Sequence, residues 1–587
     1  MRTILFFVLA LATIIEATPE VARAQKPAAR PNILLIVGDD IGFGDLGISG
    51  SVTRTPNLER LANEGVMFTN FHASPVCSVT RGMLLTGNDS IDIGLGAFDY
   101  ALYPPAKGKP GYESYLTRTT VTVAELLQDA GYRTYMVGKW HLGGAEHGGQ
   151  GPHEWGFDRS YAIYTGGSNH WNQGVFHVNL DDPEVAAQVK AGIIPKEPFY
   201  EDGQEVERPI GIYSDDLYTS KMLEYLEQGR KSGQPFFAYL AYTTAHAPLQ
   251  APDFLIDKYV EHYLELGYEG LKRARFESQK VHGIIPKDAP YPSTADNDLL
   301  RPWSELSDGE RRREARMMAT YSAMMESQDY HIGILLNYLH ETGQRDDTLV
   351  IYMSDNGPEG LSDHGELSSP EFAKWIEHSF SQDDADIGRG NAFAFIGTDW
   401  ASASTGGLQW WKWFIGEGGV RVPIIISPPK GRPFAHPAQK TNEVASVKDV
   451  PMTILDYAGV QHPKSPYEGR EIAPPSGISM RAFLEGRAPR PRTEQQWFAF
   501  ELFGNSFIVA GDYKAIRVRT GMYGDGKWHL YDIKKDPGET RPLDAEQRRR
   551  LKRLIRTYDK YAKNKHIVPV AEAWNPWHGF PEDPQKN

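Results

Sequence analysis

The chain has 587 residues, of which 40% are hydrophobic and 24% are charged, and its formal net charge is -14. This composition is typical of a globular protein with room for one large domain and a smaller one. The negative charge argues against a general binder of nucleic acids or anionic membranes, and any anionic substrate requires a pocket in which basic residues are concentrated.

The first 24 residues have the pattern of an export signal. Arg2 provides a positive start, residues 4–15 are almost wholly apolar, and Ala-Arg-Ala at 22–24 is a small-x-small cleavage site. The apolar run is short for a bilayer span, and no later stretch is long and apolar enough for one. We therefore expect cleavage near Ala24, export to the periplasm or the medium, and no stable membrane insertion.

Residues 25–487 alternate between short apolar runs and helical stretches. Strands are predicted at 33–37, 66–71, 134–137, 236–242, 348–353 and 422–426. Helices are predicted at 56–64, 123–130, 214–228 and 311–341. Wholly apolar runs are typical of strands that are buried on both faces of a parallel sheet. The order predicts an α/β catalytic domain with a large, mainly parallel central sheet flanked by helices.

The pattern changes after residue 487. Short strands separated by turns are predicted at 497–502, 505–509, 513–519 and 528–531, and a basic helix is predicted at 545–561. Residues 488–587 are therefore predicted to form a smaller α+β subdomain with an antiparallel sheet and one packed helix. We interpret the basic cluster at 548–550 as a solvated helix face in preference to a binding patch.

Four of the predicted strands run into polar residues at the point where each strand ends. In open parallel sheets ligands bind beyond the carboxyl ends of the strands, so we expect these residues to converge at one edge. They are Asp39 and Asp40, Lys139 and His141, His246, and Asp355 and Asn356.

The acidic and amide residues of this set suggest a metal site. Asp39, Asp40, Asp355 and Asn356 offer oxygen ligands, which suit Ca2+ first, Mg2+ second, and not zinc. A single Asp-Asp pair commonly caps a helix or lies in a turn. Two such groups, each at a strand end, favour a metal ion.

The remaining candidates suit proton transfer and anion binding. Lys139 and His141 project to the same side of an extended segment, whereas His246 taken alone is as consistent with a structural role. Cys77 is the sole cysteine and closes no internal disulfide. A helix that begins at Cys77 would place Arg81 one turn further on the same face, and its amino end would favour an oxyanion.

In combination and in this order, several segments make the chain resemble the formylglycine-dependent (type I) sulfatases of the alkaline-phosphatase-like superfamily, most closely the bacterial arylsulfatases. They are PNILLIVGDDIGFGDLG at 31–47, the Cys77 segment, GKWHLG at 138–143, DNG at 355–357, Lys412 with EGGVRVP at 417–423, and the closing segment LYDIKKDPGE at 530–539. The resemblance covers most of the mature chain. It implies a sulfuric ester hydrolase that acts on sulfate monoesters.

The resemblance also implies the cofactors. A formylglycine-generating enzyme would oxidise Cys77 to Cα-formylglycine, whose hydrate is the nucleophile in this family. The ligands of Ca2+ that the resemblance implies are Asp39, Asp40, residue 77, Asp355 and Asn356.

The same resemblance implies catalytic roles for basic residues. Arg81 and Lys139 would stabilise the hydrate and its charge. His246 or Lys412 would protonate the leaving alcohol or phenol. His141 would then remove the proton from the second hydroxyl, which expels sulfate and restores the aldehyde.

One residue departs from the family pattern. The family core is Cys-x-Pro-x-Arg, and here it reads CSVTR, with Val79 in place of the proline that maturation enzymes commonly recognise. Because Cys77 and Arg81 are both present, we expect the protein to be matured.

Two other functions stay open. The first is hydrolysis of phosphate or phosphonate esters by a similar site, and the second is non-catalytic binding of sulfated glycans if Cys77 stays a thiol. The loops at 97–118, 251–303 and 362–406 are expected to set the substrate. Aryl sulfates serve as the assay class, and the natural substrate is not encoded in the motifs.

Overall fold

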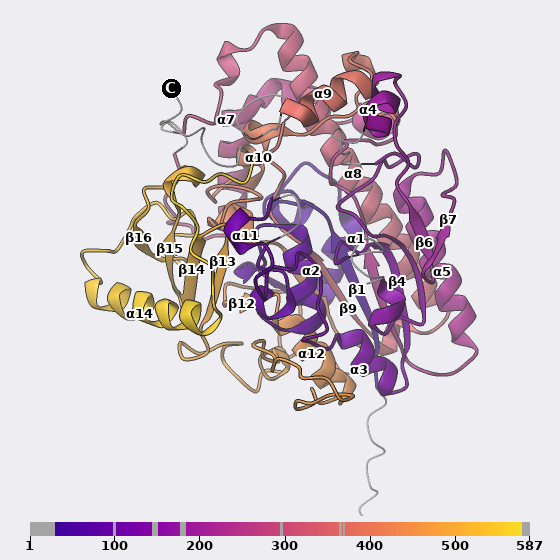
Figure 1. The fold of residues 1–587 in the computed structure, drawn as a ribbon, viewed down its shortest axis with the longest axis vertical. Helices are drawn as coiled ribbons and strands as arrows, with labels where there is room; N and C mark the ends of the chain where they lie inside the picture. Colours follow the sequence, from indigo (N-terminus) through magenta and orange to yellow (C-terminus); the bar gives the residue numbers. More distant parts are fainter. Residues whose placement is uncertain are drawn as a thin grey trace, which may run out of the picture. The chain divides into compact units, whose positions relative to one another are not determined.

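A sheet of ten strands forms the centre of the computed structural model, which describes residues 30–97, 101–143, 151–175, 183–293, 297–362, 367, 370–430 and 432–577 (Figure 1). From edge to edge its strands are β11 (Gln439–Thr441), β2 (Val66–Phe68), β10 (Ile424–Ser427), β9 (Thr348–Ser354), β1 (Asn32–Gly38), β8 (Phe236–Ala241), β4 (Arg133–Lys139), β5 (Arg159–Ile163), β6 (Phe199–Glu201) and β7 (Gln204–Val206). The predicted signal segment, residues 1–24, lies outside the described residues.

The middle of this sheet is parallel. β9, β1, β8, β4 and β5 run in one direction, whereas β10 and β6 pair antiparallel with their neighbours. Residues Ile33 to Val37 of β1 are fully buried between β9 and β8, as expected for a strand covered on both faces. The predicted α/β fold with a large, mainly parallel sheet is confirmed.

Helices flank the sheet in two groups, in the first of which α8 contacts both other helices and in the second of which all three helices contact one another. One group contains α1 (Pro56–Glu64), α5 (Ser214–Arg230) and α8 (Asp308–Glu341), and the other contains α2 (Cys77–Thr86), α3 (Val123–Asp129) and α12 (Asp449–Ala458). Both α3 and α8 begin with a capping box, on Thr122 and Ser307 respectively. The remaining described α-helices of this part are α4 (Pro183–Lys190), α6 (Asp253–Ile256), α7 (Val260–Val281), α9 (Pro370–Ser379), α10 (Gly397–Thr405), α11 (Glu417–Val420) and α13 (Arg481–Leu484).

The segment 251–303 contains a long helix, α7, which the sequence pattern did not predict. The buried positions of α7 recur every three or four residues, as in any packed helix. Tyr263, Tyr268, Leu271 and Phe276 fill buried positions of this helix, but Lys272, Arg275 and Gln279 fill three others and interrupt the apolar pattern. Gly267 breaks the helix with φ 62°, and a Cβ there would meet the ring of Trp303 at 2.5 Å.

The C-terminal part has the predicted architecture. β13 (Phe498–Leu502), β14 (Asn505–Ala510), β15 (Tyr513–Arg517) and β16 (Trp528–Asp532) form an antiparallel sheet in sequence order. The helix α14 (Arg548–Asn564) packs on this sheet through Leu551, Leu554, Tyr558 and Tyr561. A two-stranded sheet of β3 (Phe71–His72) and β12 (Ala445–Ser446) completes the set. The boundary between residues 487 and 488 stays a prediction.

Among the described residues, no helix combines the length and the apolar character that a membrane crossing requires.

Candidate active site

The candidate residues meet where the central parallel strands end. β1 and β9 end in register at Gly38 and Ser354, and Ala241 at the end of β8 pairs with Val37. Lys139 is the last residue of β4, Cys77 and Arg81 lie on α2, and the other predicted site residues lie on loops. The site residues that the structure brings together are Asp39, Asp40, Cys77, Arg81, Lys139, His141, His246, Asp355, Asn356 and Lys412.

One half of the site is an ion-pair cluster around Asp39 and Asp355. Lys139 Nζ lies 2.7 Å from Asp39 Oδ2, and Arg81 Nη2 lies 2.7 Å from Asp355 Oδ2. Arg81 Nη2 is also 3.6 Å from Asp39, and Arg81 Nη1 donates to the carbonyl of Lys139 at 2.9 Å. The guanidinium thus holds two carboxylates in place, as its planar fork allows.

The other half is centred on Asp40, which has φ 60° at the turn after β1. Asn356 Nδ2 donates to Asp40 Oδ1 at 2.6 Å, and Lys412 Nζ lies 2.8 Å from the same oxygen. Lys412 Nζ also contacts Glu359 at 2.8 Å, and His246 Nε2 lies 3.7 Å from Asp40 Oδ2. Burial opposes the charge on Lys412, but Asp40 and Glu359 outweigh it and hold its pKa well above the usual value.

Cys77 is the first residue of α2 and lies between the two halves of the site. Its Sγ is 3.4 Å from Nδ1 of His141, and its ligand atoms and those of Asp39 and Asp355 all lie within 4.8 Å of one another. Burial raises the pKa of the Cys77 thiol. An unmodified cysteine here is therefore a poorer nucleophile than an exposed one.

The carboxylates fit a divalent cation. Asp39 Oδ1 and Asn356 Oδ1 are buried and have no hydrogen-bond partner among the described residues, which is costly unless a ligand satisfies them. Burial and, next to it, the charge of Asp355 raise the pKa of Asp39 to about 8, and burial raises that of Asp40 to about 6. A positive ion between these oxygens would remove both penalties, and the all-oxygen donor set suits a hard cation.

The sequence interpretation missed two residues of the site. Glu359 pairs with Lys412 and accepts a hydrogen bond from Trp413 Nε1 at 3.2 Å; its position four residues after Asp355 is a signal that could have identified it. His170 donates from Nε2 to the carbonyl of His246 at 3.0 Å, and burial lowers the pKa of this histidine to about 3. No local pattern marks His170, because it acts on a segment 76 residues away.

A family model described as Sulfatase matches residues 31–460 of the chain. The chain belongs to the sulfatase family. An uncharacterized sulfatase of Schizosaccharomyces pombe is 37% identical over 558 residues, which cover 93% of this chain and 96% of that protein. The arylsulfatase of Klebsiella aerogenes is 32% identical and covers 79% of this chain and 94% of its own.

Solved structures show the same fold. A sulfatase from Pseudoalteromonas sp. matches with a TM-score of 0.57 over 92% of both chains, at 20% identity, which shows the fold. The family and the curated relatives assign this sulfatase to the hydrolases of sulfate esters.

Proposed function

We propose that this sulfatase depends on formylglycine at position 77 and on one bound Ca2+ ion, and that it cleaves sulfate monoesters for which aryl sulfates are a suitable assay class. The observation that carries the proposal is the position of Cys77. It begins α2 at the meeting point of two acidic groups, with His141 at 3.4 Å and the buried Arg81 one turn further along the helix.

The proposed ligands of the ion are Asp39, Asp40, Asp355, Asn356 and residue 77. The partnerless oxygens of Asp39 and Asn356 support this assignment, and Mg2+ is the second choice. When both are present, Ca2+ supplies a Lewis acid for a sulfate oxygen and the formylglycine hydrate supplies the attacking hydroxyl.

The basic residues have separate tasks in this proposal. Arg81 and Lys139 are fully buried and stabilise the negative charge that develops on the sulfuryl oxygens. His141 accepts the proton from the second hydroxyl of residue 77, since its Nδ1 already faces that side chain.

Of the two candidates for the acid, Lys412 fits better than His246. Lys412 carries its proton because Asp40 and Glu359 hold its pKa high. His246 uses its Nδ1–H on the carbonyl of Ala247 at 2.7 Å, and burial and the nearby lysines keep its pKa well below the usual value. His246 therefore presents an unprotonated Nε2 to the site, and Lys412 is the group that delivers a proton to the leaving oxygen.

Two further proposals concern the export and the maturation of the protein. The pattern at residues 1–24 supports export with cleavage near Ala24, and the CSVTR core supports a formylglycine-generating enzyme as its maturation partner. Both processes precede metal binding at the folded site.

The test combines mass spectrometry with kinetics on exported full-length protein. The peptide that carries residue 77 should show the aldehyde or its hydrate, and para-nitrophenyl sulfate should be hydrolysed. Removal of the metal with a chelator should abolish turnover and Ca2+ should restore it. The Cys77→Ala variant is the matched control and should be inactive.

Two outcomes would contradict the proposal. A thiol at residue 77 in fully active protein would exclude formylglycine as the nucleophile. Faster hydrolysis of para-nitrophenyl phosphate or of a phosphonate monoester than of the sulfate would assign the site to the other ester class.

A further inference from the structure

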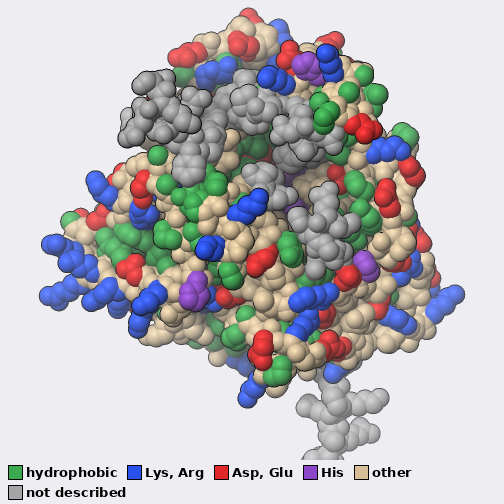
Figure 2. Space-filling view, in the orientation of Figure 1, with side chains coloured by type: hydrophobic (Ala, Val, Ile, Leu, Met, Phe, Trp, Pro, Cys, Tyr) green, Lys and Arg blue, Asp and Glu red, His purple; other side chains and the backbone are tan. Residues whose placement is uncertain are grey.

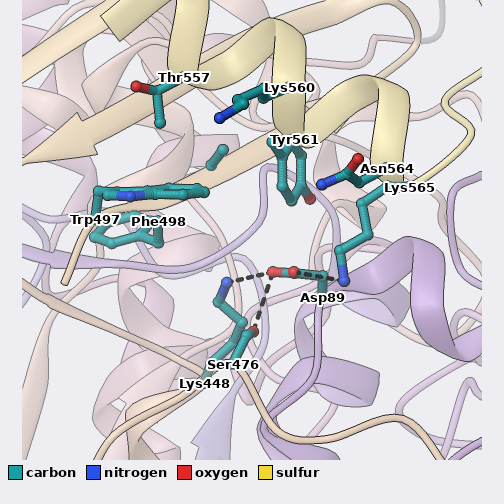
Figure 3. A pocket seen from close by; sticks show the side chains of 11 residues that line it. Asp89, Lys448, Ser476, Trp497, Phe498, Thr557, Lys560, Tyr561, Asn564 and Lys565 are labelled. Carbon is teal, nitrogen blue, oxygen red and sulfur yellow. Dashed lines mark hydrogen bonds and ion pairs between the residues drawn. The ribbon is translucent and has the colours of Figure 1, made fainter. Parts of the chain in front are cut away.

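A hollow of about 520 Å³ lies between α14 and the catalytic part of the chain (Figure 3). Trp497 and Phe498 form one side, α14 contributes Lys560 and Asn564, and Asp89 lies at the base. None of the candidate catalytic or metal-binding residues lines this hollow.

The hollow is separated from Cys77 by the length of α2. That helix begins at Cys77 and ends at Thr86, and Asp89 follows it. Ten residues of α-helix span about 15 Å. The hollow is therefore a second region, beyond the reach of a small ester bound at residue 77.

Trp497 gives the hollow an aromatic wall. Its side chain is 39% exposed, and its ring meets that of Tyr561 edge to face at 6.3 Å with an interplanar angle of 89°. This contact favours one orientation of the indole. An exposed indole face is suited to pack against the C–H face of a sugar ring.

The charges inside the hollow are balanced, whereas those at its rim are not. Asp89 pairs with Lys448 and with Lys565, and Lys565 also pairs with Asp92. At the rim, Lys560 and Asn564 are exposed, and neither has a side-chain partner among the described residues. An ammonium group and an amide are therefore available to an anionic or hydroxylated ligand.

Lys560 is also part of a basic stripe along α14, which we define as Arg549, Lys552, Arg556, Lys560 and Lys563. The spacing of three or four residues places these side chains on one face of the helix, opposite the buried Leu551, Leu554, Tyr558 and Tyr561. All five are exposed, and no ion pair joins any of them to a described carboxylate. Figure 2 shows the Lys and Arg side chains gathered over this part of the molecule.

Stability does not explain the basic stripe. Like charges three or four residues apart repel one another, and the helix dipole favours only the end of the stripe at Lys563 and opposes the end at Arg549. By contrast, the neighbouring Arg550 and Arg553 share Glu494 as a partner. The unpaired row instead concentrates positive potential on a protein whose net charge is -14.

We propose that the basic stripe and the Trp497 hollow together form a docking site for a sulfated polysaccharide, which replaces, for Arg549, the sequence-based interpretation as part of a solvated helix face. A sugar ring packs on Trp497, Lys560 and Asn564 bind its sulfate and hydroxyl groups, and the stripe binds the sulfates that follow along the chain. The choice of sulfate among anions rests on the proposed function. The site would hold a polymeric substrate while residue 77 acts elsewhere on it.

The shape of the hollow distinguishes between polyanions. A flat anionic membrane would touch the stripe but would not enter the hollow. A sugar polymer satisfies the indole, the amide and the stripe together. Anionic vesicles and single-stranded DNA are therefore competitors in the test.

The test measures the binding of heparin to the full-length protein by biolayer interferometry at low and moderate salt. A stripe variant, R549Q/K552Q/R556Q/K560Q, should bind about tenfold or more weakly and lose most of the salt dependence. Trp497→Ala should weaken binding several-fold and keep the salt dependence. The matched control, K190Q/K231Q/K287Q/K464Q, removes four exposed charges elsewhere and should bind as the wild type does.

Turnover separates this proposal from the proposed function. The stripe variant and Trp497→Ala should hydrolyse para-nitrophenyl sulfate with unchanged kcat and KM, and only KM for a sulfated polymer should rise. If the wild type hydrolyses no sulfate ester, the proposed function fails while heparin binding still reports on the docking site. Equal binding of heparin by stripe and control variants overturns the docking site. So does equal or tighter binding of desulfated heparin, DNA or phosphatidylserine vesicles.

Discussion

Val79 occupies a position that concerns both the proposed maturation of Cys77 and the folded helix α2. It is the third residue of α2 and is fully buried, whereas the family core has proline at this position. The first amides of an α-helix have no acceptor inside the helix, so proline in the first turn removes no intrahelical hydrogen bond. We therefore expect valine at this position to affect recognition of the unfolded chain by the proposed maturation enzyme more than the stability of the folded helix.

We predict that Val79→Pro raises the fraction of residue 77 that is converted to formylglycine. The stability of the folded protein should change by about 1.5 kcal/mol or less, because valine and proline have similar volumes. Peptide mass spectrometry of exported protein measures the converted fraction, and urea denaturation measures the stability. An unchanged fraction would show that the maturation enzyme reads the chain without this proline.

At the scale of elements, the hairpin of β13 and β14 combines a tight turn with a buried carboxyl group. Phe503 and Gly504 connect the strands with φ of 56° and 78°, as in the two-residue turns that suit twisted strands. Glu501 accepts a hydrogen bond from the amide of Gly504. Burial raises the pKa of Glu501 to about 8, so the folded protein keeps this proton at neutral pH.

This shift predicts a dependence of stability on pH. Between pH 4.5, the ordinary pKa, and about 8, the folded state binds a proton that the unfolded state has lost. Stability from this group is therefore present below pH 4.5 and decreases by roughly 1 kcal/mol per pH unit as pH rises through that window.

The Glu501→Gln variant should lose this dependence, since an amide has no proton to release and still accepts from Gly504. Its free energy of unfolding relative to the wild type should rise between pH 5 and 8, as measured by urea denaturation. The matched control Glu207→Gln changes an exposed residue and should follow the wild type. A parallel pH profile of Glu501→Gln and the wild type would contradict the assigned pKa.

At the scale of the whole molecule, a buried charge network joins the C-terminal sheet to the segment that carries Lys412. Lys514 of β15 contacts Glu417 at 2.8 Å and Glu539 at 2.9 Å. Glu417 begins α11, and its carboxylate lies 3.0 Å from His72. The network therefore ties three distant parts of the sequence together within the unit Pro31–Asn587.

We predict that Lys514→Met destabilises the protein by roughly 3–5 kcal/mol, because it leaves the buried Glu539 without its cation and Glu417 with only Arg421 and His72. Turnover should fall as well, since α11 follows the Lys412 segment directly. Denaturation and kinetics on the full chain measure both effects, with the exposed Lys527→Met as control. A loss of stability within that of the control would show that the network contributes no net free energy.

Much of the site was predictable from local sequence. The ends of the predicted strands give the positions of Asp39, Lys139 and Asp355 in the fold, because a buried apolar run must stop where polar side chains begin. The C-terminal sheet was predictable for a similar reason, since its strands alternate with short turns. These signals are local, so they can be recognised without knowing which residues are neighbours in the folded protein.

The sequence by itself determined the class of fold, the order of the main strands and the residues that meet at the edge of the sheet. Only the tertiary structure revealed the helix α7, in which Lys272, Arg275 and Gln279 fill three of the buried positions. Only the tertiary structure also showed the contacts of Glu359 and His170. It also revealed the partnerless oxygens of the proposed metal site and the hollow beside Trp497. The physical reason is that hydrophobic periodicity is written along the chain, whereas ion pairs and hydrogen bonds join residues that only folding brings together.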